Sequence, residues 1–172
     1  TKRFRPDVAA ILNISRDHFD WHGSLSEYVL AKSKIFQNQG EDDWLILNAD
    51  DPTVMKLSGF SAKPLYFSLK EEVRGAFLSG EYLFLNLDRK VPILKVEELP
   101  TMGPHNIENA LATILLAYLV GADIERIREG LRTFVPLPHR LEWVGKIGEV
   151  NIYNDSKATN PHAVFAALRS FK

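Results

Sequence analysis

The sequence of 172 residues predicts an α/β fold: a mostly parallel sheet with a small antiparallel patch. Two short, nearly continuous apolar runs, residues 8–14 and 44–48, are typical of strands buried on both faces. A helical pattern lies between them, and the order strand, helix, strand indicates a parallel βαβ unit. Short strands separated by turn residues follow, which favours local antiparallel pairing.

The first helix is predicted over residues 24–39. Ser24 and Glu27 have the spacing of a capping box at its start. Leu25, Tyr28 and Lys32 follow the three-four spacing of one helix face. Lys32 is therefore unusual, because a leucine or isoleucine is expected on an apolar stripe.

The antiparallel patch is predicted from four short runs rich in apolar residues, 65–68, 75–79, 82–87 and 91–94. Residues 79–81, Ser-Gly-Glu, read as a hairpin turn between the second and third runs. These strands are expected to attach to the edge of the α/β core.

Two helices complete the first part of the chain, over residues 106–120 and 124–134, and Asn106 has the chemistry of an N-cap for the first of them. The prolines of residues 135–138 then break the pattern. We therefore place a domain boundary there, with one domain over residues 1–137 and another beginning over 138–172.

After the boundary we expect a hairpin around Gly148, with strands over residues 141–147 and 149–154. A polar loop then leads into a helix. Asn160 followed by Pro161 is a strong helix-start signal, because asparagine caps the helix and proline suits its first turn.

Composition excludes several functions. The chain has 21 basic and 22 acidic residues, a formal net charge of −1, which disfavours nucleic acid or an anionic membrane as a partner held by bulk charge. No cysteine is present, so thiolate metal sites and cysteine nucleophiles are excluded. The longest apolar stretch, residues 110–120, is shorter than the roughly 20 residues of a membrane span. No signal peptide is evident, and we expect a cytoplasmic location.

Lys32 has two interpretations. Its stem can be buried while the ammonium reaches water, the commoner behaviour of lysine. Alternatively, the amine points inward, where burial lowers the pKa of a lysine. A neutral amine can be carbamylated by carbon dioxide, and the product is a carboxylate-like ligand for Mg²⁺.

Residues 17–22, Asp-His-Phe-Asp-Trp-His, directly follow the first predicted strand. Sites of α/β proteins gather at that end of the strands, which makes His18 a candidate functional residue. His18 and His22 are also spaced as a zinc pair, although they fall in a predicted loop and no third ligand is evident.

Two further residues, Asn109 and Arg140, carry groups that suit a nucleotide. Asn109 lies one turn into its helix, and its amide offers a donor and an acceptor to the edge of an adenine ring or to the helix start itself. Arg140, after His139, has a fork of donors that matches phosphate oxygens, although a surface ion pair is the commoner role.

The loop of residues 154–160, Asn-Asp-Ser-Lys-Ala-Thr-Asn, precedes a helix N-terminus, where anions are favoured. Such a density of donors and acceptors favours a ligand site over a simple turn. Asp155 can accept hydrogen bonds from ribose hydroxyls, and Lys157 and Thr159 can hold a carboxylate or phosphate.

The chain resembles the Mur ligase family, and most of all its D-glutamate-adding members. The resemblance rests on an ordered set of blocks that spans nearly the whole chain, residues 12–18, 28–36, 47–51, 103–110, 137–140 and 154–160. It implies the second half of a mostly parallel-sheet ATPase domain, then the start of a Rossmann-like C-terminal domain. The implied reaction is ATP-dependent amide ligation in peptidoglycan synthesis through an acyl phosphate, with UDP-N-acetylmuramoyl-L-alanine, D-glutamate and ATP as substrates, Mg²⁺ as cofactor and a monomeric enzyme.

The resemblance also implies roles for single residues. The metal-binding residues would be His18 and Lys32, the latter as a carbamate. The nucleotide-binding residues would be Asn109 at adenine, Arg140 at the phosphates with His139 supporting it, and Asp155 at the domain junction. Lys157 and Thr159 would face the glutamate or the acyl phosphate.

The family's glycine-rich phosphate loop is not found in these residues, since Gly145-Lys146 is followed by isoleucine. We therefore expect the phosphate loop upstream of Thr1 and an inactive fragment. Alternatives are a Mur or folylpolyglutamate-type ligase with another amino-acid specificity, a non-catalytic nucleotide-binding module, and a zinc hydrolase built on His18 and His22.

Overall fold

A computed structural model describes residues 3–14 and 24–171. Six strands form one sheet in the order of the sequence, parallel from β1 to β4 and antiparallel from β4 to β6. The strands are β1 (Val8–Ile11), β2 (Trp44–Asn48), β3 (Lys63–Ser68), β4 (Gly75–Ser79), β5 (Tyr82–Asn86) and β6 (Lys90–Lys95). The predicted α/β class with an antiparallel patch is therefore confirmed.

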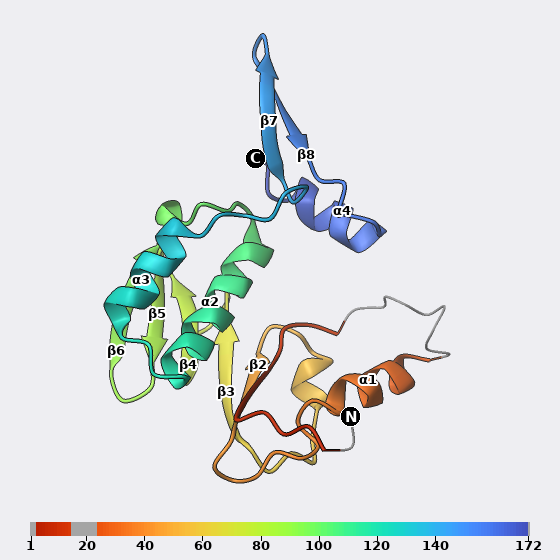
Figure 1. Cartoon of the computed structure of the whole chain (residues 1–172), viewed down its shortest axis with the longest axis vertical. Helices are drawn as coiled ribbons and strands as arrows, with labels where there is room; N and C mark the ends of the chain where they lie inside the picture. Colours follow the sequence, from red (N-terminus) through yellow and green to blue (C-terminus); the bar gives the residue numbers. More distant parts are fainter. Residues whose placement is uncertain (1–2, 15–23, 172) are drawn as a thin grey trace.

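Helices cover both faces of this sheet (Figure 1). The helices of this part are α1 (Leu25–Ser33), α2 (Pro104–Leu119) and α3 (Ile124–Thr133), with short 3-10 turns η1 (Val54–Lys56) and η2 (Val96–Glu98). Strand alternation explains the two cores, because Ile46 of β2 faces the α2 side while Leu45 and Leu47 face the α1 and η1 side. All three are at most 2% exposed, as expected of a strand buried on both faces.

One strand and one helix differ from the sequence prediction. Residues 65–68 pair in parallel with both neighbours, so β3 belongs to the parallel part and the antiparallel patch begins at β4. The first helix ends at Ser33, where the chain tightens into turns such as Phe36 N–H to Ser33 O at 3.2 Å. Its Ser24 cap is confirmed, since the hydroxyl accepts from the N–H of Glu27.

The start of α2 also differs from the prediction. Gly103 is the N-cap, with a φ of 93° that favours glycine, and Pro104 occupies the first helical position. Asn106 lies inside the helix, where its side-chain amide donates to the carbonyl of Met102 at 2.6 Å. Proline explains the shift, because its fixed φ and missing N–H suit the first turn.

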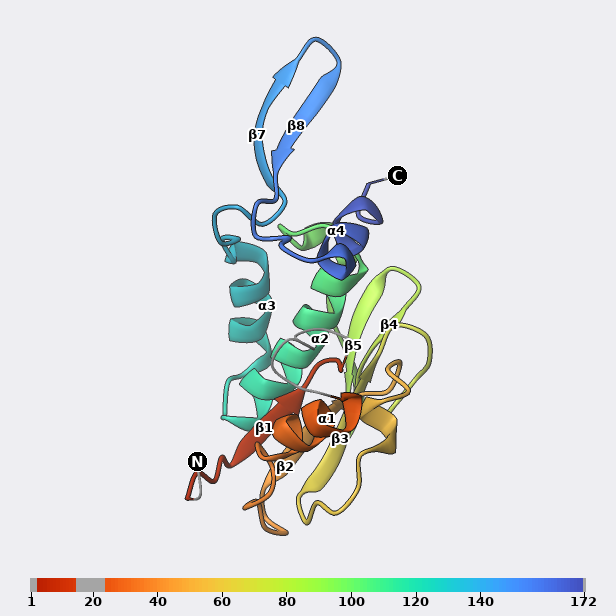
Figure 2. The same cartoon turned by 90° about the vertical axis from the view of Figure 1, so that its right-hand side faces the viewer.

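The segment after the prolines forms a separate antiparallel pair, β7 (Glu142–Ile147) and β8 (Val150–Asn154), followed by α4 (Pro161–Leu168). The hairpin projects away from the six-stranded sheet, while α4 lies near the first turn of α2 (Figure 2). The predicted cap is confirmed, because Asn160 Oδ1 accepts from Ala163 N–H at 2.8 Å.

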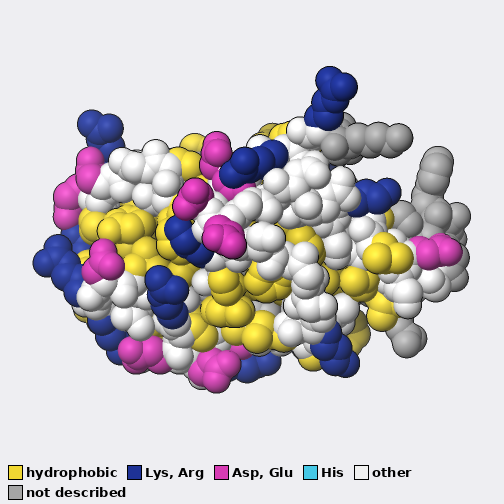
Figure 3. Space-filling view, turned by 90° about the horizontal axis from the view of Figure 1, so that it is seen from below, with side chains coloured by type: hydrophobic (Ala, Val, Ile, Leu, Met, Phe, Trp, Pro, Cys, Tyr) yellow, Lys and Arg dark blue, Asp and Glu magenta, His cyan; other side chains and the backbone are white. Residues whose placement is uncertain are grey.

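Two surface properties follow the composition. Acidic and basic side chains are interspersed over the face seen in Figure 3, in keeping with a net charge near zero. Among the described helices, none combines the length and apolarity needed to cross a membrane.

Candidate functional site

A cavity of about 790 Å³ lies between α2, α3, the loops at either end of the β7–β8 hairpin and α4. Its walls therefore come from residues before, within and after the proline-containing segment 135–138. Its lining includes the polar side chains of His105, Glu108, Asn109, Arg126, Arg140, Asp155 and Lys157. Four of the residues singled out in the sequence thus share one cavity, although they are up to 48 positions apart in the chain.

One part of the cavity is apolar. Small side chains of α2 and its following turn, Ala117 and Ala122, face Ile127, Leu131 and Phe134 from α3 and its end. Small residues leave room between two packed helices, and apolar walls favour a flat ring over a charged group. Asn109 lies on α2 within this lining and carries an exposed amide.

Arg140 lies in an unusual backbone setting. Both neighbours, His139 and Leu141, have positive φ values of 66° and 48°. Non-glycine residues in this region cost about 1–3 kcal/mol each and cluster at functional sites. The strain is held by hydrogen bonds from the next loop, because Leu141 N–H donates to Asp155 Oδ1 at 3.1 Å and Lys157 N–H donates to the carbonyl of His139 at 3.1 Å.

His139 and Thr159, also predicted as site residues, do not line the cavity. The His139 ring is hydrogen-bonded through Nδ1 to Asn154 Nδ2 at 2.8 Å, and its backbone N–H donates to Glu142 at 2.8 Å. These bonds make His139 a support of the Arg140 turn. Thr159 is exposed, and its N–H donates to the carbonyl of Lys157 at 3.0 Å.

Sequence reasoning missed three titratable residues of the lining, His105, Glu108 and Arg126. Burial raises the pKa of the Glu108 carboxyl, while a hydrogen bond from Asn48 acts in the opposite direction. Burial also lowers the pKa of the His105 imidazole, with Asp155 raising it and Arg140 lowering it. His105 and Glu108 both lie close to Asn109 near the start of α2, but neither forms a distinctive pattern in the sequence.

The carboxyl end of β2 is fixed by a second polar cluster. Asn48, only 3% exposed, donates to the carbonyl of Leu12 at 2.9 Å. Asp51 accepts from the N–H of Ile14 at 2.8 Å and from Thr53 N–H at 2.7 Å. These bonds connect the ends of β1 and β2, where ligands of parallel sheets bind.

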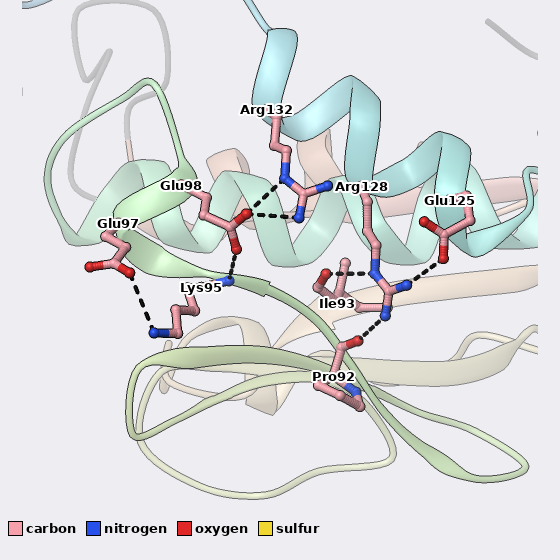
Figure 4. A network of polar contacts seen from close by, with 8 residues as sticks. All are labelled: Pro92, Ile93, Lys95, Glu97, Glu98, Glu125, Arg128 and Arg132. Atoms are coloured by element: carbon pink, nitrogen blue, oxygen red, sulfur yellow. Dashed lines mark hydrogen bonds and ion pairs between the residues drawn. The ribbon is translucent and has the colours of Figure 1, made fainter.

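α3 is fixed to the sheet edge by two arginines (Figure 4). Arg128 donates to the carbonyls of Ile93 and Pro92 at 2.8 and 2.6 Å, and Arg132 Nε donates to Glu98 at 2.8 Å. Glu98 also accepts from the backbone N–H of Lys95 at 2.9 Å. The helix wall of the cavity is therefore held by named polar contacts as well as by packing.

The fold and the cavity agree with the outcome of sequence comparison. The Mur ligase middle domain matches residues 1–117, which is more than half of the chain. The chain belongs to the Mur ligase family.

Relatives of this Mur ligase chain support the assignment. The UDP-N-acetylmuramoylalanine--D-glutamate ligase of Acidobacterium capsulatum is 46% identical over 176 residues, covering 99% of this chain and 38% of the relative. A solved pseudomurein peptide ligase type C from Methanothermus fervidus is 25% identical with a TM-score of 0.76, over 96% of this chain and 41% of that one. MurF ligase from Thermotoga maritima in complex with ADP shares the fold, at 22% identity and a TM-score of 0.70 over 98% of this chain and 40% of its own. The Mur ligase chain thus spans less than half the length of each.

Of the two predicted metal-binding residues of this Mur ligase chain, the structure describes only Lys32. His18 lies outside the described residues. The inward orientation considered for Lys32 is wrong: the side chain is exposed, and its ammonium lies 5.3 Å from the centre of the Tyr28 ring. A cation gains little from burial when water and an aromatic face are both within reach. Over residues 3–14 and 24–171, no group of three or more acidic or histidine side chains is placed to hold a metal ion.

Proposed function

We propose that this chain is the part of an ATP-dependent amide ligase that binds ATP while D-glutamate is joined to UDP-N-acetylmuramoyl-L-alanine. One observation carries the proposal: a single cavity gathers Asn109, Arg140 and Asp155 from both sides of the proline boundary. The names of the D-glutamate ligase relatives supply the substrates. The ADP held by the related MurF supports a nucleotide as the ligand.

The lining suggests how ATP lies in the cavity. The apolar part between α2 and α3 suits the adenine ring, with the Asn109 amide at its polar edge. Asp155 can accept hydrogen bonds from the ribose hydroxyls. Arg140 then faces the phosphates, where its fixed fork of donors offsets the negative charge. Arg140 is exposed in this structure and is therefore free to meet a ligand.

The chemistry proceeds in two balanced steps. A carboxylate oxygen of UDP-N-acetylmuramoyl-L-alanine attacks the γ-phosphorus of ATP, and the bond to ADP breaks to give an acyl phosphate. The amine of D-glutamate then attacks the acyl carbon, phosphate leaves, and the amine loses its proton. Arg140 stabilises charge on the transferring phosphoryl group. Lys157 lines the cavity, and we place its ammonium and the neighbouring Thr159 hydroxyl beside the acyl phosphate or the incoming glutamate.

We also propose that Lys32, as a carbamate, and His18 hold Mg²⁺. Bound there, the ion would offset charge on the phosphates. A carbamate at Lys32 would present the oxygen ligands that Mg²⁺ prefers. The structure brings no other described metal ligand to Lys32, and neither of the two chemical steps is assigned to the ion. ATP is a metabolite of the cell interior, so we place the reaction in the cytoplasm.

The decisive experiment is a turnover assay of the full-length protein. It measures ADP release from ATP with UDP-N-acetylmuramoyl-L-alanine and a panel of amino acids. We expect release that depends on D-glutamate. ADP release that depends on a different amino acid would identify the protein as a Mur or folylpolyglutamate-type ligase with another specificity. ADP binding without turnover would make it a nucleotide-binding module. Stoichiometric zinc bound through His18 and His22 would favour the hydrolase.

A further inference from the structure

His105 occupies the first turn of α2 and lines the cavity, yet the proposed reaction does not use it. Its Nδ1 atom is buried and has no hydrogen-bond partner among the described residues. A buried polar atom without a partner costs about 1–3 kcal/mol, so native structures retain few of them. This nitrogen can therefore take part in a further hydrogen bond.

The charged neighbours of His105 come from across the proline boundary. Asp155, at the end of β8, acts on the imidazole more strongly than Arg140 does, and the two act in opposite directions. The backbone also brings the two sides together here. A Cβ atom on Gly103 would lie 2.0 Å from the hydroxyl oxygen of Ser170, so the start of α2 closely approaches the end of α4.

Asp155 connects the start of α2 to the turn that carries Arg140. Its Oδ1 accepts from Leu141 N–H at 3.1 Å, and Leu141 directly follows Arg140. A carboxylate can accept several hydrogen bonds at once, so this bond leaves capacity for another donor. A bond from His105 to Asp155 would therefore link α2, which carries Asn109, to the strained turn that carries Arg140.

We propose that His105 is a positioning residue of the nucleotide site: its Nδ1–H donates to the Asp155 carboxylate when a nucleotide fills the cavity, and this bond fixes the spacing between Asn109 and Arg140. The inference rests on the proposed function, because it needs a nucleotide in the cavity. Burial lowers the pKa of the imidazole, so the ring is neutral at pH 7 and carries a single N–H. The bond then sets which ring nitrogen holds that proton.

Three variants of the full-length protein test the position of the bond. His105→Ala removes the donor, His105→Asn places an amide N–H near the position of Nδ1, and His105→Gln places it near Nε2. We expect His105→Ala to weaken ADP binding about tenfold, the loss of one hydrogen bond to a charged group. We expect His105→Asn to restore most of that loss and His105→Gln to restore little. Calorimetry gives the dissociation constants, and melting temperatures confirm that each variant is folded.

A double-mutant cycle tests the partner. In the Asp155→Ala background, His105→Ala should change ADP affinity little, because the acceptor is already gone. In the single variant His105→Ala, the KM for ATP should rise by a larger factor than kcat falls. Two results would overturn the role of His105. One is a double variant in which the two losses of ADP affinity multiply, and the other is a His105→Gln variant that binds ADP as tightly as His105→Asn does. Wild-type protein that does not bind ADP would instead overturn the proposed nucleotide site itself.

Discussion

Asp155 accepts a hydrogen bond from the backbone N–H of Leu141 at 3.1 Å, which connects the end of β8 to the residue after Arg140. We therefore expect Asp155→Ala to act twice, by removing a group for the ribose and by releasing the turn around Arg140. The dissociation constant for ADP, measured by calorimetry, should rise at least about tenfold. The matched control is Glu149→Ala, whose carboxylate is 97% exposed at the tip of the same hairpin. Equal affinities in both variants would remove Asp155 from the site.

Arg140→Ala should reduce kcat/KM for ATP strongly while changing the melting temperature little. The side chain is exposed, and exposed charges contribute at most about 1 kcal/mol to stability. Arg140→Lys should recover only part of the activity, because an ammonium lacks the planar fork that matches phosphate. Steady-state kinetics with ATP as the varied substrate give both values. The control is Arg89→Ala, an exposed arginine between β5 and β6. Unchanged ATP kinetics in Arg140→Ala would contradict the phosphate contact.

The acid stability of the protein should depend on Glu98. The backbone N–H of Lys95 and then Arg132 hold the pKa of this carboxyl below its ordinary value of 4.5. A lowered pKa in the folded state stabilises the fold fully above that ordinary value, and the contribution disappears as the pH falls through the lower, folded-state pKa. We expect Glu98→Gln to flatten the decline of the melting temperature in this acid range. Glu97→Gln, altering a carboxylate that is 73% exposed, should leave the decline as it is.

Asp51 should matter for stability more than its exposure suggests. Its two oxygens accept three backbone N–H groups, those of Ile14, Thr53 and Val54. Asp51→Ala leaves these donors without partners, so we expect a loss of about 1–3 kcal/mol in the free energy of unfolding, measured with urea. Asp88→Ala, at an exposed position between β5 and β6, should change this free energy by less than about 0.5 kcal/mol.

The sequence predicts most of the fold because the signals are local. The apolar run of β2, the Ser24 cap and the Asn160-Pro161 start each decide an element within a few residues. The parallel pairing of β3 is not local, since it depends on which strands lie beside residues 63–68. Helix spacing alone also cannot say whether Lys32 reaches water.

The candidate site also combines residues that local sequence signals predict with residues whose role depends on the packed structure. Residue chemistry predicts Asn109, Asp155 and Lys157 beside helix starts and Arg140 after the prolines, and the structure gathers all four in one cavity. His105 was passed over because a histidine in a first turn has no distinctive pattern. Its importance arises from Asp155, which is 50 positions away in the chain. The strain at His139 and Leu141 is likewise a property of the packed loop, and leucine gives no hint of a positive φ.

Lys32 provides the sharpest test of the metal proposal, because its exposure separates function from folding. Lys32→Ala should leave the melting temperature within about 1 °C, since an exposed side chain over Tyr28 contributes little. Turnover of the full-length protein should nevertheless collapse if a carbamate at this position holds Mg²⁺. Acetate or formate should then restore part of the activity by supplying the missing oxygens, whereas Lys34→Ala, a neighbouring exposed lysine, should need no rescue. Full activity in Lys32→Ala would end the carbamate proposal, and loss without rescue would assign Lys32 a role other than a metal-binding carbamate.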